Sequence, residues 1–181
     1  QLARAGQRGG HPARAERAIA VSLGLKEDFF AASYRKPLSR GGIIHYPAQD
    51  PQSPADQYGV APHSDYGCLT LLWQDDTGGL QVKGRSGDWI AATPIEDSFV
   101  INIGDLLARW SNERFVSTPH RVVNASGRDR YSMVVFHDPH GDTLVDPRDM
   151  ALPEGTAPLP EPIRVSDYIA GRFAEAFAYK S

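Results

Sequence analysis

The sequence contains 181 residues, and its 19 Lys and Arg against 22 Asp and Glu give a formal net charge of −3. This length suits a single domain with a substantial core, and a hydrophobic content of 41% excludes a disordered chain. The near-neutral charge argues against nucleic acid as a partner, the single Cys68 excludes an internal disulfide framework, and no apolar run approaches the ~18 residues that span a bilayer. Because the opening residues also lack the apolar core of a signal peptide, we expect a soluble, cytoplasmic protein.

The first 41 residues are predicted to be a basic lead-in followed by a helix. Four arginines lie among the glycines of residues 1–17, which is typical of a solvated tail. Ala15, Ile19 and Leu23 then recur at four-residue steps, so we predict a helix over residues 15–25 that ends at Gly24.

The middle of the chain, residues 42–140, is predicted to be mainly β. Short apolar runs alternate with turn residues, and the 17 Gly and 14 Pro of the chain favour short elements. Strands at this spacing indicate a sandwich or jelly roll rather than βαβ units, with one helical turn inserted at residues 104–110. The predicted strands cover residues 42–46, 69–73, 80–82, 89–91, 98–103, 120–123 and 131–136.

The last segment, residues 141–181, is predicted to be a Pro-rich link and a C-terminal helix. The link extends to residue 162, and Ser166 can then act as the N-cap of the helix. Ile169, Phe173 and Phe177 would share one face of that helix, because they are four residues apart.

Three residues have the spacing and the chemistry of a metal site. His63 and Asp65 stand two residues apart, so in an extended chain both side chains point to the same face. Taken alone, this pair is more typical of a turn with a solvated Asp. However, His120 opens an apolar strand 57 residues later and can complete a set of two imidazoles and one carboxylate. Such a facial triad leaves metal positions open, as oxygen and a chelating cosubstrate require.

A second pair of residues is suited to binding a carboxylate. Arg130 and Ser132 open the next predicted strand and differ by two, so their side chains share a face. A guanidinium and a hydroxyl together can hold a carboxylate by hydrogen bonds. If the strands that begin at His120 and Arg130 pair, this clamp stands near the metal ligand.

Other conspicuous residues have structural interpretations. The segment 137–142 is rich in histidine and acid, but Pro139 breaks regular geometry, so we interpret it as a surface loop. Asp105 is interpreted as a structural cap after a strand that ends in a glycine turn, rather than as a further metal ligand. The three tryptophans and Cys68 are expected to fill the core.

The order and spacing of these pieces resemble the iron(II)/2-oxoglutarate-dependent dioxygenases, specifically the isopenicillin N synthase-like branch. The resemblance extends from about Gly42 to Pro139 and implies a distorted double-stranded β-helix, or jelly roll, with flanking helices. The matching stretches are His45-Tyr46-Pro47, Pro62-His63-Ser64-Asp65, Leu69-Thr70-Leu71-Leu72, Gly78-Gly79-Leu80-Gln81-Val82, Trp89, Asn102-Ile103-Gly104-Asp105, Trp110-Ser111-Asn112, Ser117-Thr118-Pro119-His120-Arg121-Val122 and Arg130-Tyr131-Ser132.

The resemblance implies an enzyme that couples oxidative decarboxylation of 2-oxoglutarate to the hydroxylation, desaturation or cyclisation of a small organic substrate with molecular oxygen. Tyr46 matches a family tyrosine that binds the cosubstrate, although this chain has Ile44 where many members carry Asn two residues earlier. The implied Fe(II) ligands are His63, Asp65 and His120, and the implied residues for the distal carboxylate of 2-oxoglutarate are Arg130 and Ser132.

Two other functions remain open on the sequence. A jelly-roll module could bind a metal or a ligand without turnover, and a zinc hydrolase could use the same three metal ligands, although it has no use for the carboxylate clamp. Relatives carry a substantial N-terminal region, so we interpret residues 1–41 as its remnant and the chain as a fragment. An open sheet edge and an exposed apolar face around Ile19, Leu23, Phe29 and Phe30 are then expected, together with self-association.

Overall fold

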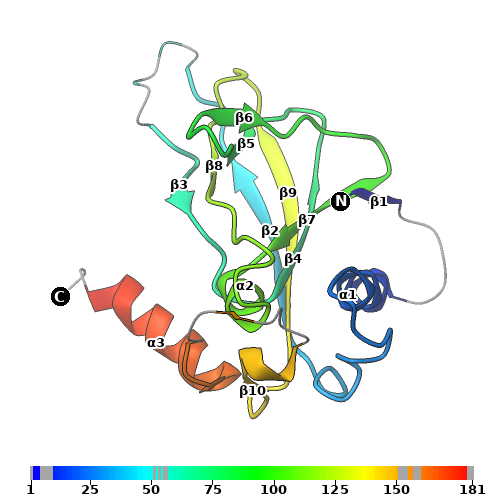
Figure 1. Cartoon of the computed structure of the whole chain (residues 1–181). Coiled ribbons are helices and arrows are strands. Elements are labelled where there is room, and N and C mark those ends of the chain that lie inside the picture. Colours follow the sequence, from blue (N-terminus) through cyan, green and yellow to red (C-terminus); the bar gives the residue numbers. More distant parts are fainter. Residues whose placement is uncertain are drawn as a thin grey trace.

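Two antiparallel sheets form most of the computed structural model, which describes residues 2–4, 10–50, 52, 54, 57–150, 155–156 and 160–178 (Figure 1). A third, small sheet pairs β10 (Leu144–Val145) with β11 (Ile163–Arg164). The main sheet has the order β1 (Leu2–Arg4), β7 (Ser98–Ile103), β4 (Leu69–Gln74), β9 (Arg130–Asp138) and β2 (Leu38–Tyr46). The second sheet has the order β3 (Val60–His63), β8 (His120–Val122), β5 (Leu80–Lys83) and β6 (Trp89–Ala91).

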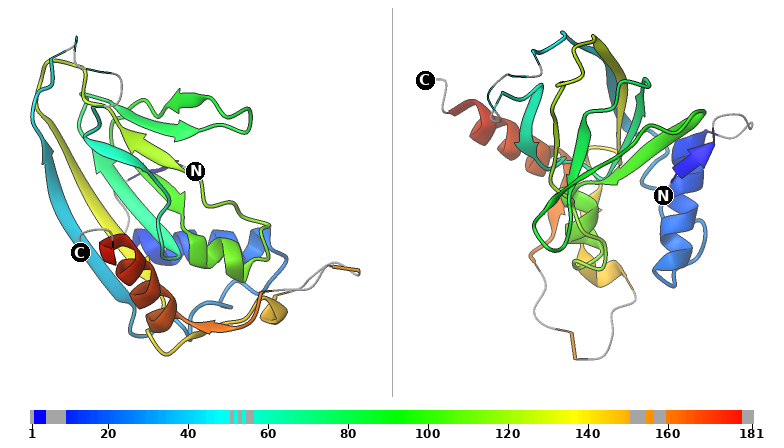
Figure 2. Two further views of the ribbon diagram at one scale, coloured as in Figure 1. Left: turned by 90° about the vertical axis from the view of Figure 1, so that its left-hand side faces the viewer. Right: turned by 90° about the horizontal axis from the view of Figure 1, so that it is seen from above.

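Helices flank these sheets, as predicted. The helix α1 (His11–Ser22) and the helix α3 (Val165–Ala178) lie on opposite sides of the main sheet (Figures 1 and 2). The short helix α2 (Asp105–Trp110) follows β7, and a 3-10 turn (Pro147–Asp149) follows β10. None of the described helices is long and apolar enough to cross a membrane.

The strands that begin at His120 and Arg130 do not pair, so the condition stated for the carboxylate clamp is not met. Strand β9 has β4 on one side and β2 on the other, so neither of its edges is left for β8. Strand β8 instead lies between β3 and β5 in the second sheet. His120 and Arg130 therefore belong to different sheets.

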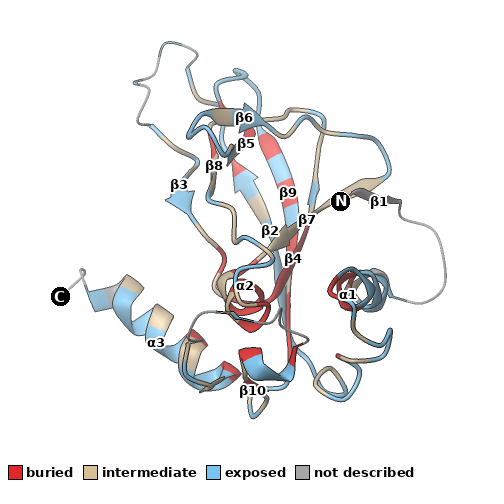
Figure 3. Cartoon of the chain, in the orientation of Figure 1, coloured by how far each residue is buried: buried red, intermediate tan, exposed pale blue. Residues whose placement is uncertain are grey.

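The apolar face of α1 is buried, which contradicts the expectation that it would be exposed. Ile19, Leu23 and Phe30 are each less than 9% exposed, and Phe29 is partly buried. Figure 3 shows both buried and exposed positions along α1. The ring of Phe30 lies 5.2 Å from that of Trp110 on α2. The chain turns back after α1 and brings Phe29 and Phe30 against α2, so this face has a partner within the chain.

The N-terminal segment also has more structure than the solvated tail predicted for it. The backbone of Leu2–Arg4 pairs with β7 and occupies its free edge, which satisfies backbone groups that an edge strand leaves open. Helix α1 begins at His11, four residues before the predicted start, and Pro12 suits its first turn. Residues 5–9 of the predicted tail lie outside the described residues.

The surface loop predicted at residues 137–142 is wrong for its first half. Strand β9 continues to Asp138, because β2 begins at Leu38 and pairs with β9 along its whole length. His137 is buried against Glu16 of α1, with 2.8 Å between its Nε2 and a carboxylate oxygen, and its Nδ1 lies 2.9 Å from the hydroxyl of Ser39. Only the second half of the segment, from His140, reaches the surface.

Two details of the predicted core and C-terminal helix also differ. Helix α3 begins at Val165, so Ser166 lies inside the first turn instead of capping it. Ile169 is buried, but Phe173 is 41% exposed, and the side chain of Phe177 lies outside the described set. Of the three tryptophans, Trp110 alone is in the buried core.

Candidate functional site

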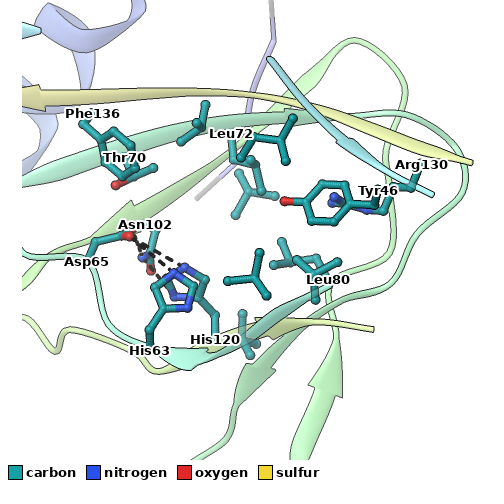
Figure 4. A pocket seen from close by; sticks show the side chains of 16 residues that line it. Tyr46, His63, Asp65, Thr70, Leu72, Leu80, Asn102, His120, Arg130 and Phe136 are labelled. Atoms are coloured by element: carbon teal, nitrogen blue, oxygen red, sulfur yellow. Dashed lines mark hydrogen bonds and ion pairs between the residues drawn. The ribbon is translucent and has the colours of Figure 1, made fainter. Parts of the chain in front are cut away.

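The three predicted metal ligands come together at the end of the paired strands β3 and β8. His63 ends β3, His120 opens β8, and the two residues are cross-strand partners. Asp65 follows in the loop after β3. The Nε2 atoms of His63 and His120 lie 4.0 and 3.7 Å from Asp65 Oδ1, and the candidate ligand atoms of the three residues all lie within 4.8 Å of one another (Figure 4).

Backbone carbonyls orient both imidazoles. The Nδ1 of His63 lies 2.8 Å from the carbonyl of Ala61, and the Nδ1 of His120 lies 3.1 Å from that of Thr118. Because Nδ1–H donates in each case, Nε2 carries the lone pair that a metal needs. Burial lowers the pKa of His120, and the neighbouring His63 also lowers it. These effects outweigh the Asp65 carboxylate, which raises this pKa, so the neutral imidazole is favoured.

The carboxylate of Asp65 is held by a residue that sequence reasoning missed. The side-chain amide of Asn102 donates to Asp65 Oδ2 over 2.6 Å and leaves Oδ1 to face the histidines. From the sequence, Asn102 is part of the predicted strand 98–103 and of a matching stretch, with no role of its own assigned to it. The available signal was an amide side chain among the apolar residues of β7, where a polar group needs a partner once it is buried.

The loop that carries Asp65 rests on the start of α2. The backbone N–H of Asp105 donates to the carbonyl of Asp65 over 2.8 Å. A Cβ atom at Gly104 would collide with the carbonyl of Gly67, so the close approach of these two backbone segments requires glycine at position 104. The predicted capping role of Asp105 is wrong, since Gly104 is the N-cap and the Asp105 carboxylate accepts from Ser64 over 3.2 Å and from Arg172 of α3 over 2.8 Å.

A cavity of about 140 Å³ extends from the metal donors between the two sheets. His63, Asp65 and His120 stand at one end, and Arg130 and Tyr46 stand at the other (Figure 4). The walls between the two ends are mostly apolar and comprise Ile44, Val60, Thr70, Leu72, Leu80, Val82, Val100, Val122, Val134 and Phe136. His120 and Arg130 therefore face the same cavity from opposite sheets, although their strands do not pair.

Arg130 is fully buried, and not all of its guanidinium nitrogens have a hydrogen-bond partner. Its Nε donates to the carbonyl of Gly78 over 2.5 Å, and its Nη2 donates to Gln74 Oε1 over 3.0 Å. Within the described part of the chain, its Nη1 has no hydrogen-bond partner, and no carboxylate forms an ion pair with it. The guanidinium carbon lies 4.6 Å from the ring centre of Tyr46.

The two hydroxyls predicted to accompany Arg130 are its neighbours. Arg130 and Ser132 are buried on β9, whereas Tyr131 and Met133 are exposed, so the predicted sharing of a face is confirmed. The hydroxyl oxygens of Ser132 and Tyr46 lie 3.5 Å apart. The polar end of the cavity is thus lined by the Arg130 cation and by Tyr46, and the Ser132 hydroxyl lies next to the hydroxyl of Tyr46.

Residues 28–139 match the family model of the 2OG-Fe(II) oxygenase superfamily. The chain belongs to this superfamily. The family predicted from the sequence is therefore confirmed, while its isopenicillin N synthase-like branch stays a prediction.

Relatives of this oxygenase chain match it over most of its length. It is 36% identical over 174 residues to the 2-oxoglutarate-Fe(II) type oxidoreductase hxnY of Emericella nidulans, covering 90% of this chain and 48% of the relative. It is 42% identical over 135 residues to a homoarginine-6-hydroxylase of Oryza sativa, covering 72% of this chain and 41% of the relative. The chain thus spans about half the length of these curated relatives.

Solved structures of the superfamily share the fold. A full-length Neurospora crassa protein in complex with alpha-KG and thymine has a TM-score of 0.82 at 36% identity, covering 91% of this chain and 52% of that chain. The JOX2 complex with 2OG, Fe and JA has a TM-score of 0.75 at 31% identity, covering 88% and 47%. The predicted mainly β jelly-roll fold is confirmed.

Proposed function

We propose that this chain forms the catalytic region of an Fe(II)/2-oxoglutarate-dependent dioxygenase acting on a small organic molecule. The reaction couples oxidative decarboxylation of 2-oxoglutarate to hydroxylation, desaturation or cyclisation of that molecule with molecular oxygen. His63, Asp65 and His120 hold the iron. The distal carboxylate of 2-oxoglutarate is held by Arg130, Ser132 and Tyr46.

The observation that carries this proposal is the unsatisfied guanidinium of Arg130. A buried cation that forms no direct ion pair is costly, and a buried N–H group without an acceptor adds to that cost. A ligand carboxylate at this end of the cavity removes both costs, because it supplies a negative charge and an acceptor for Nη1. A zinc hydrolase that used the same metal donors would leave Arg130 unexplained.

The metal donors fit Fe(II). Two imidazole nitrogens and one carboxylate oxygen form the donor set of non-haem iron oxygenases, and its open positions accept a chelating cosubstrate. Bound iron and 2-oxoglutarate together supply the oxidising power for attack on a C–H bond. The chain contributes orientation through Asn102 and the backbone carbonyls, and its apolar walls keep water from the reacting atoms.

The test separates this oxygenase from a binding module without turnover. Anaerobic addition of Fe(II) and 2-oxoglutarate to the protein is expected to give a weak visible charge-transfer band, and oxygen is expected to convert the mixture to succinate. Arg130→Leu should require far more 2-oxoglutarate to form the band, and His120→Ala should form none. A band that forms without any succinate after oxygen is admitted would favour the binding module.

The nature of the relatives supports a small-molecule substrate, since the names of similar proteins include a homoarginine hydroxylase and a thymine complex. The cytoplasmic location and the absence of nucleic-acid partners stay predictions from composition.

A further inference from the structure

A second cavity opens on the other side of the metal donors. Its volume is about 460 Å³, and it shares His63, Asp65, Val134 and Phe136 with the cavity that ends at Arg130. The candidate metal centre therefore lies where two cavities meet. The cosubstrate proposed above accounts for the first cavity, and the second has no assigned occupant.

Arg40 brings a cation to the wall of this second cavity. Its side chain is 43% exposed, and its guanidinium carbon lies 6.0 Å from the ring centre of Phe136 and 5.6 Å from that of Phe173. Its Nη2 donates to the fully buried carboxylate of Asp138 over 3.0 Å. Its other N–H groups make no further hydrogen bond to the described residues, so they are available to an acceptor in the cavity.

Besides Phe136 on β9, two further aromatic rings from separate parts of the chain contribute to this wall. Tyr66, in the metal loop, meets Phe173 of α3 edge to face at 5.9 Å. Helix α3 is fastened there by Arg172, whose guanidinium carbon lies 4.5 Å from the Tyr66 ring and whose Nη1 donates to Asp105. The contacts of Arg172 hold the Tyr66 ring and helix α3 in place. A flat molecule can pack closely against aromatic rings, so this wall favours a flat occupant.

The charge around Arg40 limits what the occupant must carry. The carboxylate of Asp138 pairs with the guanidinium of Arg40, so an occupant of the cavity need not be negatively charged. The free N–H groups of Arg40 can donate to an oxygen acceptor in the cavity, which a neutral carbonyl or a carboxylate can supply.

We propose that the second cavity binds the molecule to be oxidised, and that this molecule is a flat unsaturated ring carrying a carbonyl or carboxylate oxygen. The oxygen accepts hydrogen bonds from Arg40, and the ring packs against Phe136 and Phe173 beside the metal donors. This inference rests on the proposed function, because that function places an iron ion at the boundary between the two cavities. It adds Arg40 and Phe173 as residues that determine substrate specificity.

The test uses Mn(II) in place of Fe(II), because Mn(II) accepts the same donors and its paramagnetism broadens the NMR signals of nearby protons. The chain is mixed with Mn(II), saturating 2-oxoglutarate and one of three probes, and the broadening of probe signals is measured. Benzamide and benzoate are flat rings with an oxygen acceptor, and cyclohexanecarboxamide keeps the carbonyl but is not flat. The same mixtures with His120→Ala give the background from unbound Mn(II).

The NMR signals of benzamide, of benzoate or of both are expected to broaden. The concentration needed for this effect should be roughly fivefold lower than the concentration needed for cyclohexanecarboxamide. Phe173→Leu should weaken that binding roughly fivefold, and Arg40→Gln roughly tenfold. Arg164→Gln removes the same charge from a side chain that is 58% exposed on β11, and should leave probe binding unchanged. Arg40→Gln keeps a donor for Asp138, and if it still fails to fold, Phe173→Leu decides because Phe173 is 41% exposed.

Broadening of 2-oxoglutarate without broadening of any probe overturns this inference and leaves the proposed function standing. Equal broadening of all three probes, or no effect of Phe173→Leu and Arg40→Gln, likewise overturns it. If 2-oxoglutarate itself is not broadened, the proposed function fails, and the substrate assignment fails with it.

Discussion

Replacing Arg130 by leucine removes the only cation at the polar end of the described cavity. The substitution deletes the unpartnered Nη1 that is available to a ligand carboxylate. It also removes the donors that now serve the carbonyl of Gly78 and the side chain of Gln74. The metal donors at the opposite end keep all of their contacts, because none of them touches Arg130.

The burial of Arg130 sets the expected loss of 2-oxoglutarate affinity. Removing one partner of a buried, hydrogen-bonded charge pair costs roughly 2–5 kcal/mol, and Arg130 is fully buried. At about 1.4 kcal/mol for each tenfold change, the dissociation constant of 2-oxoglutarate should rise by roughly 30-fold to several thousandfold. Ser132→Ala removes one neutral hydrogen-bonding group and should cost only about 0.5–1.5 kcal/mol.

The assay is a titration of 2-oxoglutarate into each protein loaded anaerobically with Fe(II), read by the visible charge-transfer band. A separate titration of Fe(II) alone measures metal affinity, which should be nearly the same in Arg130→Leu and the parent. Circular dichroism shows whether the variant is folded. Arg164→Leu is the matched control, because it removes an arginine that is 58% exposed and lies outside the cavity lining.

Equal 2-oxoglutarate affinity in folded Arg130→Leu and the parent would refute the reasoning. It would mean that the distal carboxylate is bound elsewhere. A parallel loss of Fe(II) affinity would also count against it, because the substitution would then be acting through the fold rather than through the clamp.

Three further predictions concern the metal end. His120→Ala should abolish Fe(II) binding measured by equilibrium dialysis, whereas His140→Ala should bind Fe(II) like the parent, and the reverse pattern would reject the ligand assignment. Asn102→Ala should weaken Fe(II) binding by roughly 10- to 100-fold with little change in circular dichroism, because the amide orients a ligand without being one. Gly104→Ala should destabilise the fold by about 1–3 kcal/mol in urea unfolding, since its Cβ would collide with the carbonyl of Gly67, and an unchanged midpoint would contradict that close contact.

Most of the correct predictions from the sequence rest on the spacing of residues that are close together in the chain. The sharing of a face by Arg130 and Ser132 follows from the two-residue period of an extended chain and agrees with the structure. His63 and Asp65 also come together, but Asp65 lies in the loop after β3, so that loop rather than the strand period places its carboxylate beside the imidazole. Predictions of this kind depend only on a few neighbouring residues. They succeed because strand geometry repeats wherever a strand forms.

Long-range pairing could not be predicted in the same way. The burial of His137 depends on Glu16, which lies 121 positions away, and on Ser39, which lies 98 positions away across β2. No local pattern identifies such partners, so the sequence predicts a surface loop where a buried contact between histidine and glutamate forms. Asn102 was overlooked for a similar reason, because its importance arises only when β7 passes behind the loop of Asp65.

The shared boundary between the two cavities has a consequence for how such enzymes diversify. Only His63, Asp65, Val134 and Phe136 line both cavities, so most wall residues belong to one alone. Mutations in α3, or at the beginning of β2, can therefore accumulate without altering the end that holds Arg130. On the proposed function, the surface that recognises the substrate can therefore change by mutation while the surface that holds 2-oxoglutarate stays the same.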